Sequence, residues 1–377
     1  MILKKIKKIL FVSHDTNRAG AQLYLLSIMK YFKQNGIEII LLAINDWGSL
    51  KEEFNDLFQV YYFNVNSSSH RKSFFKKRQN VIQEIRIGHT IDLIYINTIA
   101  SVDLLPELSK TFEAPIVSHI HELQYSIAQY GSPNSLDNLF NYSNKIIACS
   151  QAVADNLQEF RNSKNIRVVH SFVENRQVIE TSKNTDKVAI KEKYGLGFDK
   201  IWICACGNAD WRKAPDIFLQ IASATLKKSK KFGFVWIGIK SEGDLFFQLD
   251  YDATKLGIKN EIKWISPTSE AVEIIDSCDI FLVSSREDPF PLVVLEAALC
   301  EKPILGFKNT GGVDEFIDES CGFKVEYLDV QQMVNQIISL DQQMIKSLGE
   351  KSKSKVLTNY SFEISIKKIE SIFNEVV

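Results

Sequence analysis

The chain has 377 residues, which is too long for one ordinary hydrophobic core and favours two domains. Lys and Arg number 45 against 46 for Asp and Glu, so the composition excludes the strong positive field of a nucleic-acid-binding protein. The six cysteines are scattered, mostly in apolar runs, which indicates reduced, buried thiols.

The N-terminus, MILKKIKKILFV, is basic but lacks the long apolar region and the small-residue cleavage site of a signal peptide. No apolar stretch approaches the ~20 residues that a membrane-spanning helix needs. We therefore expect a first β-strand at this end and a cytoplasmic protein.

Short β-rich runs alternate with helical patterns in the first half of the chain. A helix is predicted at residues 21–35, where apolar side chains recur near helical spacing. Strands are predicted at residues 9–12, 38–43, 93–96, 116–119, 145–148 and 168–172. Strands that alternate with helices form βαβ units, so this half is expected to fold around a parallel sheet.

The same pattern restarts after a polar segment, residues 174–187. The predicted strands there are KIWICAC (200–206), 234–238, 262–265, 280–283 and 303–307. We therefore predict an α/β protein with two doubly wound, Rossmann-like domains that face each other across a cleft. The expected parts are an N-terminal domain (1–173), a linker (174–198), a C-terminal domain (199–358) and a final helix (359–377) that returns to the first domain. Ligands bind such sheets beyond the carboxyl ends of the strands.

The segment SREDPFPLVVLE (residues 285–296) joins a predicted buried strand to a predicted helix. Its loop contains Asp288, and Glu296 lies inside the helix. The unpaired N–H groups at a helix N-terminus attract phosphate, and two carboxylates accept hydrogen bonds from hydroxyl groups. The segment therefore predicts a ligand with a phosphate, a sugar and a ribose. The alternative is a capped amphipathic helix with two solvated acids.

The longer stretch EDPFPLVVLEAALCEKPILGFKNTGGVDEF resembles the donor-binding segment of retaining GT-B glycosyltransferases of family 4, the glycosyl transferases group 1. That family has two glutamates separated by seven residues and then a Gly-Gly loop. The resemblance implies that Asp288, a shorter acid, binds hydroxyls of the donor sugar and that Glu296 binds the ribose. Pro291 replaces the usual glycine and removes a backbone donor. Further expected donor-binding residues are Phe290, Leu292 and Val293.

The segment GNADWRKAPD (residues 207–216) places a basic pair just before a predicted helix. It is similar to the family's phosphate-binding loop, whose lysine aligns with Lys213. Asn208 stands where many members have an arginine, so Arg212 is expected to supply the second charge to a diphosphate. The alternative is an ordinary exposed Arg-Lys pair at the start of a helix.

The first half carries two more segments of this resemblance. SHDTNRAGAQLYL is similar to the family's Gly-Gly loop, in which Gly20 lets the backbone approach a diphosphate. PIVSHIHELQ places His119 and His121 on one face of a strand end, and His121 aligns with the histidine that the family directs toward the donor sugar. A metal site is disfavoured because no third ligand is near, and a structural His121 is the other alternative. Strand-end residues expected to line the cleft are Asn97, Thr98 and Ser150.

The segment HRKSFFKKRQN (residues 70–80) surrounds Phe74 and Phe75 with basic side chains. This pattern predicts contact with an anionic membrane surface; the alternative is a solvated helix with two core phenylalanines. The protein is then expected at the inner face of the membrane.

The resemblance implies a retaining, metal-independent glycosyltransferase that moves a sugar from a nucleotide-sugar to a glycan or lipid-linked acceptor, in bacterial cell-surface polysaccharide synthesis. The expected catalytic residues are His121, Lys213 and Asp288, and no cofactor or metal is expected. Fixed positive groups would stabilise the departing diphosphate. The alternatives are another GT-B enzyme, a sugar-nucleotide epimerase or a phosphorylase, or a catalytically silent nucleotide- or glycan-binding subunit.

Overall fold

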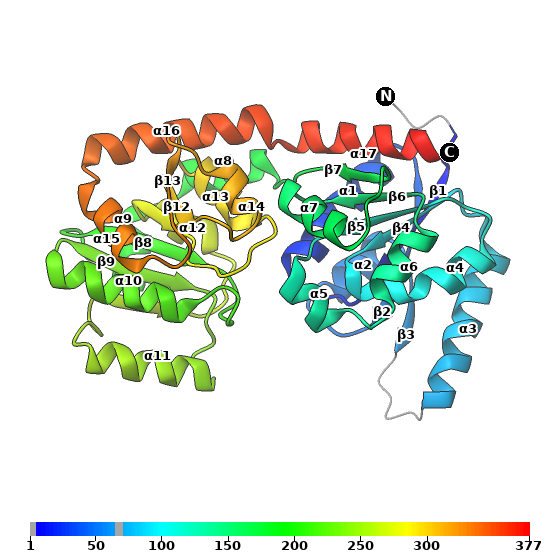
Figure 1. Ribbon diagram of the computed structural model, residues 1–377, viewed down its shortest axis with the longest axis horizontal. Coiled ribbons are helices and arrows are strands. Elements are labelled where there is room, and N and C mark those ends of the chain that lie inside the picture. The colour runs from blue at the N-terminus through cyan, green and yellow to red at the C-terminus, as the bar shows by residue number, and fades with distance from the viewer. Residues whose placement is uncertain (1–4, 65–70) are drawn as a thin grey trace. The chain divides into compact units, whose positions relative to one another are not determined.

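The computed structural model describes residues 5–64 and 71–377, and for residues 64 and 71–77 it describes the backbone alone. The chain divides into two compact units. Unit 1 contains Met1–Ser171 and Glu363–Val377, and unit 2 contains Phe172–Phe362. Each unit is built on a parallel β-sheet that is flanked by helices (Figure 1). The predicted fold class, two doubly wound α/β domains, is confirmed.

In the described part of unit 1, seven strands form a sheet in the order β3-β2-β1-β4-β5-β6-β7, and all neighbours are parallel. The strands are β1 (Lys8–Ser13), β2 (Glu38–Asn45), β3 (Gln59–Asn64), β4 (Leu93–Asn97), β5 (Ile116–Ile120), β6 (Lys145–Ala148) and β7 (Ile166–Val168). The helices are α1 (Gly20–Gln34), α2 (Lys51–Leu57), α3 (Arg71–Gly88), the 3₁₀-helix η1 (Ile99–Leu104), α4 (Leu105–Thr111), α5 (Gln124–Tyr130), α6 (Ser135–Tyr142), α7 (Gln151–Phe160) and α17 (Phe362–Val376).

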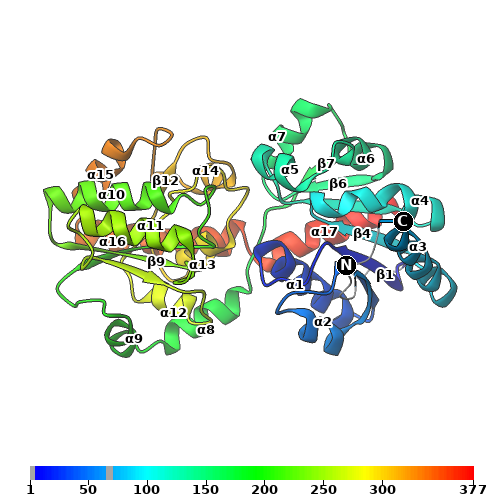
Figure 2. The same ribbon diagram turned by 90° about the horizontal axis from the view of Figure 1, so that it is seen from below.

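Unit 2 has a parallel sheet in the order β10-β9-β8-β11-β12-β13. The strands are β8 (Ile201–Cys206), β9 (Phe232–Ile237), β10 (Ile262–Ile265), β11 (Ile280–Leu282), β12 (Ile304–Phe307) and β13 (Gly322–Val325). The helices are α8 (Asn175–Asn184), α9 (Lys187–Tyr194), α10 (Pro215–Lys228), α11 (Asp244–Lys255), α12 (Ala271–Asp276), α13 (Leu292–Leu299), α14 (Gly312–Phe316), α15 (Val330–Ser339) and α16 (Gln342–Asn359). In Figure 2, α10 and α12 lie on opposite faces of this sheet.

The strand order creates one switch point in each sheet. From β1 the chain first builds outward through β2 and β3, and then crosses to the other side of β1 at β4. From β8 it builds outward through β9 and β10 and then crosses to β11. Ligand sites of doubly wound sheets form at the carboxyl ends of the strands where the order reverses. The sites are therefore expected after β1 and β4 and after β8 and β11.

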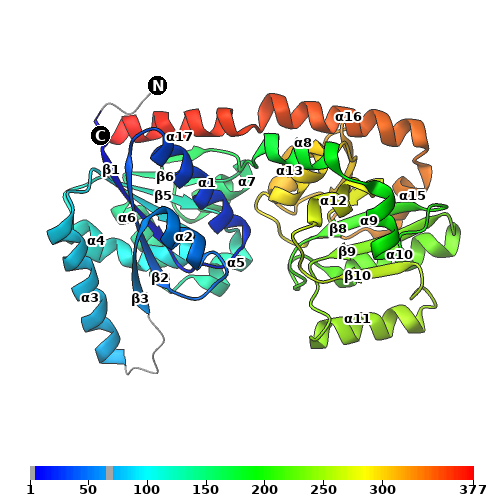
Figure 3. The same cartoon turned by 180° about the vertical axis from the view of Figure 1, so that it is seen from behind.

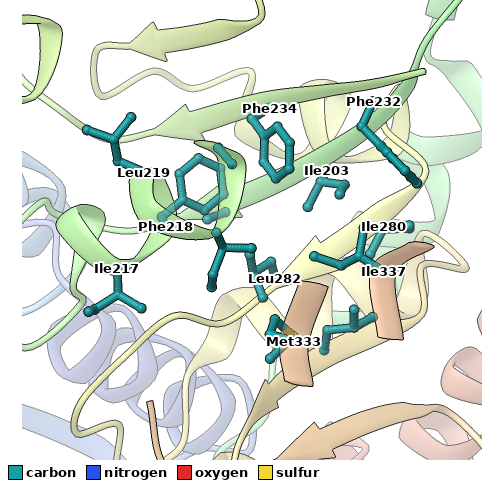
Figure 4. Packing of buried hydrophobic residues seen from close by; sticks show 14 of the residues in the cluster. Ile203, Ile217, Phe218, Leu219, Phe232, Phe234, Ile280, Leu282, Met333 and Ile337 are labelled. Carbon is teal, nitrogen blue, oxygen red and sulfur yellow. The ribbon is translucent and has the colours of Figure 1, made fainter. Parts of the chain in front are cut away.

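The core of unit 2 explains why these runs form strands covered on both faces. All six residues of β9 are buried, which is typical of a central parallel strand. Phe218 of α10 meets Phe234 of β9 edge-on, with ring centroids 5.7 Å apart. Figure 4 shows these rings beside Ile203 and Leu282, with Met333 of α15 closing the same cluster. Burial of each such side chain stabilises the unit by about 1.5–3 kcal/mol.

Three strands differ from the sequence prediction. The expected strand at residues 168–172 is wrong, because β7 ends at Val168. Val169 and Phe172 are buried all the same, so their apolar character reflects packing of the segment after the strand. The edge strands β3 and β13 were not predicted; β3 is short with a polar residue at each end, and β13 alternates glycine or lysine with apolar residues.

Residues 174–198, expected as a linker, form α8 and α9 and belong to unit 2. The side chain of Asp186 caps α9 by accepting hydrogen bonds from the backbone N–H groups of Val188 and Ala189, both at 3.1 Å. Gly195 ends the helix in the left-handed conformation.

The C-terminal helix α17 packs on unit 1, beside α1 (Figure 3). The ring of Phe373 stacks on Phe32 with centroids 5.2 Å apart. The Tyr31 hydroxyl donates a hydrogen bond to the Glu370 carboxylate at 3.0 Å, and the Ser365 hydroxyl donates to the His170 carbonyl at 2.9 Å. The last helix of the chain therefore completes the first unit.

Candidate active site

The loops after β8 and β11 meet at the switch point of unit 2. The backbone N–H of Arg286 donates to the Arg212 carbonyl at 2.7 Å, and the Ser284 hydroxyl donates to the Lys213 carbonyl at 3.1 Å. These contacts exist because β8 and β11 are adjacent parallel strands whose carboxyl ends open on the same edge. The two segments that the sequence singled out are thereby brought together.

Lys213 and Asp288 form a buried ion pair at this point. Lys213 Nζ lies 2.5 Å from Asp288 Oδ2, and the two side chains are 14% and 4% exposed. The Asp210 carboxylate accepts the backbone N–H of Lys213 at 2.7 Å, which fixes the start of the lysine side chain. The two expected catalytic residues of unit 2 therefore neutralise each other.

Asp288 is fixed by hydrogen bonds of both its side chain and its backbone. The Ser285 hydroxyl donates to Asp288 Oδ2 at 3.1 Å, so this oxygen accepts from two groups. Its backbone N–H donates to the Thr310 carbonyl at 2.6 Å, and its carbonyl accepts the N–H of Gly312 at 2.9 Å. A Cβ at position 312 would lie 2.0 Å from the Pro289 carbonyl oxygen, so only glycine fits there. The Gly-Gly loop thus positions the acid.

Two arginines support the loops. Arg212 Nη1 donates to the Glu287 carbonyl at 3.2 Å and lies 3.8 Å from Asp288 Oδ1. Arg212 is therefore a second cation beside Asp288. Arg286 makes two hydrogen bonds to the Asp216 carboxylate, at 3.0 and 2.6 Å, and ties the β11 loop to the start of α10.

Glu296 lies in the second turn of α13 and is partly buried. Among the residues that the structure describes, none donates a hydrogen bond to its carboxylate or forms an ion pair with it. Burial raises the pKa of this carboxyl group to about 7. Burial also raises the pKa of the Cys206 thiol to about 12; the charge of Glu296 adds to that effect and Lys213 opposes it. The charges of Glu296 and Lys213 therefore both reach Cys206, the last residue of β8.

A small pocket lies beside the ion pair, lined among others by Cys206, Lys213, Ser285, Asp288, Pro291 and Val293. Pro291 is the N-cap of α13, and Leu292 and Val293 are its first two residues. The N–H groups of such first residues have no partner inside the helix and suit a phosphate. Phe290 does not line this pocket: its ring is 7% exposed and packs against Tyr360, with centroids 5.4 Å apart. Its expected donor contact stays a prediction.

The histidine pair of unit 1 lies beyond β5, as the sequence predicted. The rings of His119 and His121 stack with centroids 4.1 Å apart, and Tyr24 of α1 meets both rings edge-on. His121 Nε2 lies 3.0 Å from Asn97 Oδ1, and His119 Nδ1 lies 2.5 Å from the Tyr95 hydroxyl. Burial lowers the pKa of His121 to about 3, with a smaller effect from His14, so the ring is neutral near pH 7.

Sequence reasoning missed a second group at the switch point of unit 1. His14 Nδ1 lies 2.9 Å from the Thr98 hydroxyl, and His14 Nε2 lies 3.1 Å from Gln22 Nε2. Gln22 Nε2 also donates to Asp15 Oδ1 at 2.5 Å. The sequence position of these residues could have indicated the group, because His14 and Asp15 directly follow β1 and Thr98 directly follows β4.

The other strand-end residues take supporting positions. Asn97 and Thr98 are almost fully buried, so they lie behind His121 and His14 and do not form the surface. Thr98 has φ +71°, which is strained for a β-branched residue. Ser150 is fully buried and its hydroxyl accepts the Val153 N–H at 3.2 Å, so it caps α7. Gly20 is the first residue of α1.

Two family models match the chain. "Glycosyltransferase Family 4" matches residues 18–176 and "Glycosyl transferases group 1" matches residues 186–355, so together they cover most of its length. The matched regions contain the ion pair of unit 2 and the histidine pair of unit 1. The chain is a family 4 glycosyltransferase.

Curated relatives and solved structures agree with this assignment. The N-acetyl-alpha-D-glucosaminyl L-malate synthase of Bacillus anthracis is 22% identical over 78% of this chain and 77% of its own. The O-antigen biosynthesis glycosyltransferase WclY of Escherichia coli is 24% identical over 83% of each chain. Anabaena HepE, solved in complex with UDP, superposes with a TM-score of 0.82 at 20% identity and covers 98% of this chain and 100% of its own. The glycosyltransferase therefore has the GT-B fold.

Two sequence-based expectations concern a metal ion and the membrane. Within residues 5–64 and 71–377, no three His, Cys, Asp or Glu side chains gather as a metal site would require. No helix in the same residues is long and apolar enough to span a membrane. Most side chains of the basic segment 70–80 lie outside the described residues; Arg78 is described, and its guanidinium pairs with Glu107 at 2.7 Å.

Proposed function

We propose that this glycosyltransferase moves a sugar from a nucleotide-sugar to a glycan or lipid-linked acceptor, with retention of configuration and without a metal ion. The observation that carries the proposal is the set of groups around the pocket of unit 2. It contains a largely buried lysine and the Asp288 carboxylate that this lysine neutralises. A second carboxylate, Glu296, has a raised pKa and lies one helical turn beyond the pocket-lining Val293 on α13. A raised pKa next to a pocket is typical of a functional group.

In this proposal the donor exchanges partners with the ion pair. Lys213 turns from Asp288 to the diphosphate, and Arg212 and the first N–H groups of α13 add to the positive field. Asp288 is then free to accept hydrogen bonds from hydroxyls of the sugar, and Glu296 accepts those of the ribose. These fixed positive groups stabilise the charge that grows on the departing diphosphate, a role that a divalent ion would otherwise fill.

The relatives suggest which ligands to examine first. HepE structures contain UDP, UDP and glucose, and UDP-glucose. One relative is named as a UDP-Gal-dependent galactosyltransferase that acts on a diphosphoundecaprenol-linked sugar. We therefore propose a UDP-sugar as the donor, unit 2 as the donor-binding domain, unit 1 as the acceptor-binding domain, and a place in cell-surface glycoconjugate synthesis.

A donor panel tests the proposal. The purified protein is incubated with UDP-, GDP-, ADP- and dTDP-sugars, and release of the nucleoside diphosphate is measured with and without a lipid-linked acceptor. We expect release with one nucleotide class and its loss in Glu296→Ala, while Glu192→Ala, an exposed site on α9, serves as the matched control. Silence across the panel together with nucleotide binding would indicate a silent binding subunit. Interconversion of the free donor would indicate an epimerase.

Retention and membrane association have tests of their own. The anomeric configuration of the product, read by proton NMR, equals that of the donor if the enzyme is retaining. For the membrane surface, Lys76, Lys77 and Arg78 are changed together to serine. We expect reduced co-sedimentation with vesicles that contain anionic lipid, at about 1 kcal/mol per charge. Unchanged binding to the vesicles would exclude these three residues as a membrane-binding segment.

A further inference from the structure

Asn97 at the end of β4 has a fixed amide orientation. The side chain is fully buried, and its Nδ2 donates a hydrogen bond to the Ala21 carbonyl at 3.2 Å. The carbonyl oxygen of Ala21 can only accept, so the amide nitrogen must face it. The amide oxygen Oδ1 therefore faces His121, 3.0 Å from Nε2.

This orientation determines which nitrogen of His121 carries the proton. An amide oxygen has no hydrogen to give, so the 3.0 Å contact requires a hydrogen on His121 Nε2. In a neutral imidazole the other nitrogen, Nδ1, then holds a lone pair. Among the described residues, Nδ1 has no hydrogen-bond partner, and the His121 ring is partly exposed.

The surroundings keep the ring neutral and in place. The His119 ring is stacked against it at 4.1 Å, and Tyr24 covers its edge. The Glu122 carboxylate accepts the backbone N–H groups of Ile99 and His121, at 3.1 and 2.9 Å, instead of pairing with the imidazole. The other titratable groups near this cluster are His14 and Asp15 from the β1 loop, Tyr95 from β4 and Cys149 after β6.

We propose that Asn97 is a positioning residue that fixes His121 as a hydrogen-bond acceptor, so that its Nδ1 binds a hydroxyl group of a sugar substrate. A hydroxyl can donate to this nitrogen, whereas a phosphate or carboxylate oxygen would meet a lone pair and be rejected. His121 thus selects hydroxyl groups and does not transfer protons. The inference rests on the proposed function only for the identity of the ligand; the tautomer itself is a property of the resting protein.

A spectroscopic measurement tests the tautomer without any substrate. The full chain is labelled with 15N-histidine, and the imidazole nitrogens are assigned by comparison with His121→Gln. We expect the pattern of a neutral ring protonated on Nε2 between pH 6 and 8. In Asn97→Ala the pattern should shift toward a mixture of tautomers. A ring protonated on Nδ1, or an imidazolium in this range, would overturn the proposal.

A pair of variants tests the role in the reaction. Asn97→Ala removes the acceptor and should lower kcat/KM about tenfold at every pH. Asn97→Asp keeps an acceptor but adds a charge that stabilises the imidazolium, whose Nδ1–H cannot accept. Its second carboxylate oxygen cannot donate to the Ala21 carbonyl, so the high-pH plateau should stay below the parent rate, and the rate should fall tenfold per pH unit below the new pKa of His121. Asn141→Asp is the matched control, because this exposed amide oxygen accepts from Arg161 at 2.8 Å; its pH profile should match the parent.

The outcomes separate the inference from the proposed function. Equal, pH-independent losses of kcat/KM in Asn97→Ala and Asn97→Asp would show that Asn97 is merely structural. This result would refute the inference even if the enzyme is active. If no donor is turned over, the proposed function fails, while the 15N pattern still decides the tautomer. If Asn97→Ala does not fold, Asn97→Asp and the spectrum of the parent protein carry the test.

Discussion

The carboxyl group of Glu296 should make the stability of the protein fall as the pH rises. Its pKa in the folded state is raised from 4.5 to about 7 because burial disfavours the charged form. Between these two values the folded state holds a proton that the unfolded state has lost. The free energy of unfolding therefore decreases from about pH 4.5 to about pH 7, and the contribution that is fully present below pH 4.5 is lost above pH 7.

The magnitude follows from the size of the shift. A raise of about 2.5 pKa units at 1.36 kcal/mol per unit corresponds to about 3 kcal/mol of lost stability at pH 8. The variant Glu296→Gln resembles the protonated acid at every pH. We therefore expect it to match the parent near pH 4.5 and to be more stable by about 3 kcal/mol at pH 8.

The assay is chemical unfolding of the full chain in urea at a series of pH values, with free energies extrapolated to water. Glu192→Gln, at an exposed position of α9, is the matched control and should show no pH-dependent difference from the parent. A difference between Glu296→Gln and the parent that stays constant from pH 4.5 to 8, or that grows toward low pH, would refute the reasoning.

The same ionisation should control donor binding. The charged carboxylate accepts from both ribose hydroxyls more strongly than the protonated acid, so below pH 7 part of the binding free energy is spent on removing the proton from Glu296. The dissociation constant of UDP, measured by calorimetry, should rise up to about tenfold per pH unit below 7. Binding with no such dependence in the parent, or with the same dependence in Glu296→Gln, would contradict a ribose contact.

Three further predictions concern other parts of the chain. Lys213→Met should lower kcat by about 10²–10³-fold, because it removes a preorganised positive group from the leaving diphosphate; a loss confined to KM would contradict that role. Ser150→Ala should lower the free energy of unfolding by about 1 kcal/mol through loss of the α7 cap, with kcat/KM unchanged in steady-state assays. Dialysis against EDTA should leave the transfer rate unchanged, and restoration of a lost rate by Mg²⁺ would disprove a metal-free reaction.

The central strands were predictable because the apolar pattern that identifies each of them lies within the strand itself. Strands such as β1 and β9 are buried on both faces and therefore consist of continuous apolar runs. The edge strand β13 has Gly322 and Lys324 and pairs on one side alone, so its sequence carries a weaker pattern. Burial was also mistaken for pairing at residues 168–172, since apolar side chains after a strand pack equally well without a partner strand.

The site was predictable where one short segment contains the chemistry. Lys213 and Asp288 each follow a strand, and the structure places them in contact. The contacts of Asn97 and His14 depend on which loops become neighbours, and this is a property of the strand order that no single segment encodes. The strained backbone of Thr98 is likewise imposed by its surroundings, because threonine has no intrinsic preference for that conformation.

The ion pair between Lys213 and Asp288 also has a consequence for ligand discrimination in a cell crowded with phosphate compounds. A lone phosphate that attracted the lysine would separate the buried acid from its nearest cation and leave only the more distant Arg212, 3.8 Å away, beside it. A lone sugar could not offer the lysine a new anion. A molecule that carries both kinds of group compensates both side chains of the pair, so under the proposed function a nucleotide-sugar should bind more tightly than its nucleoside diphosphate or its sugar alone.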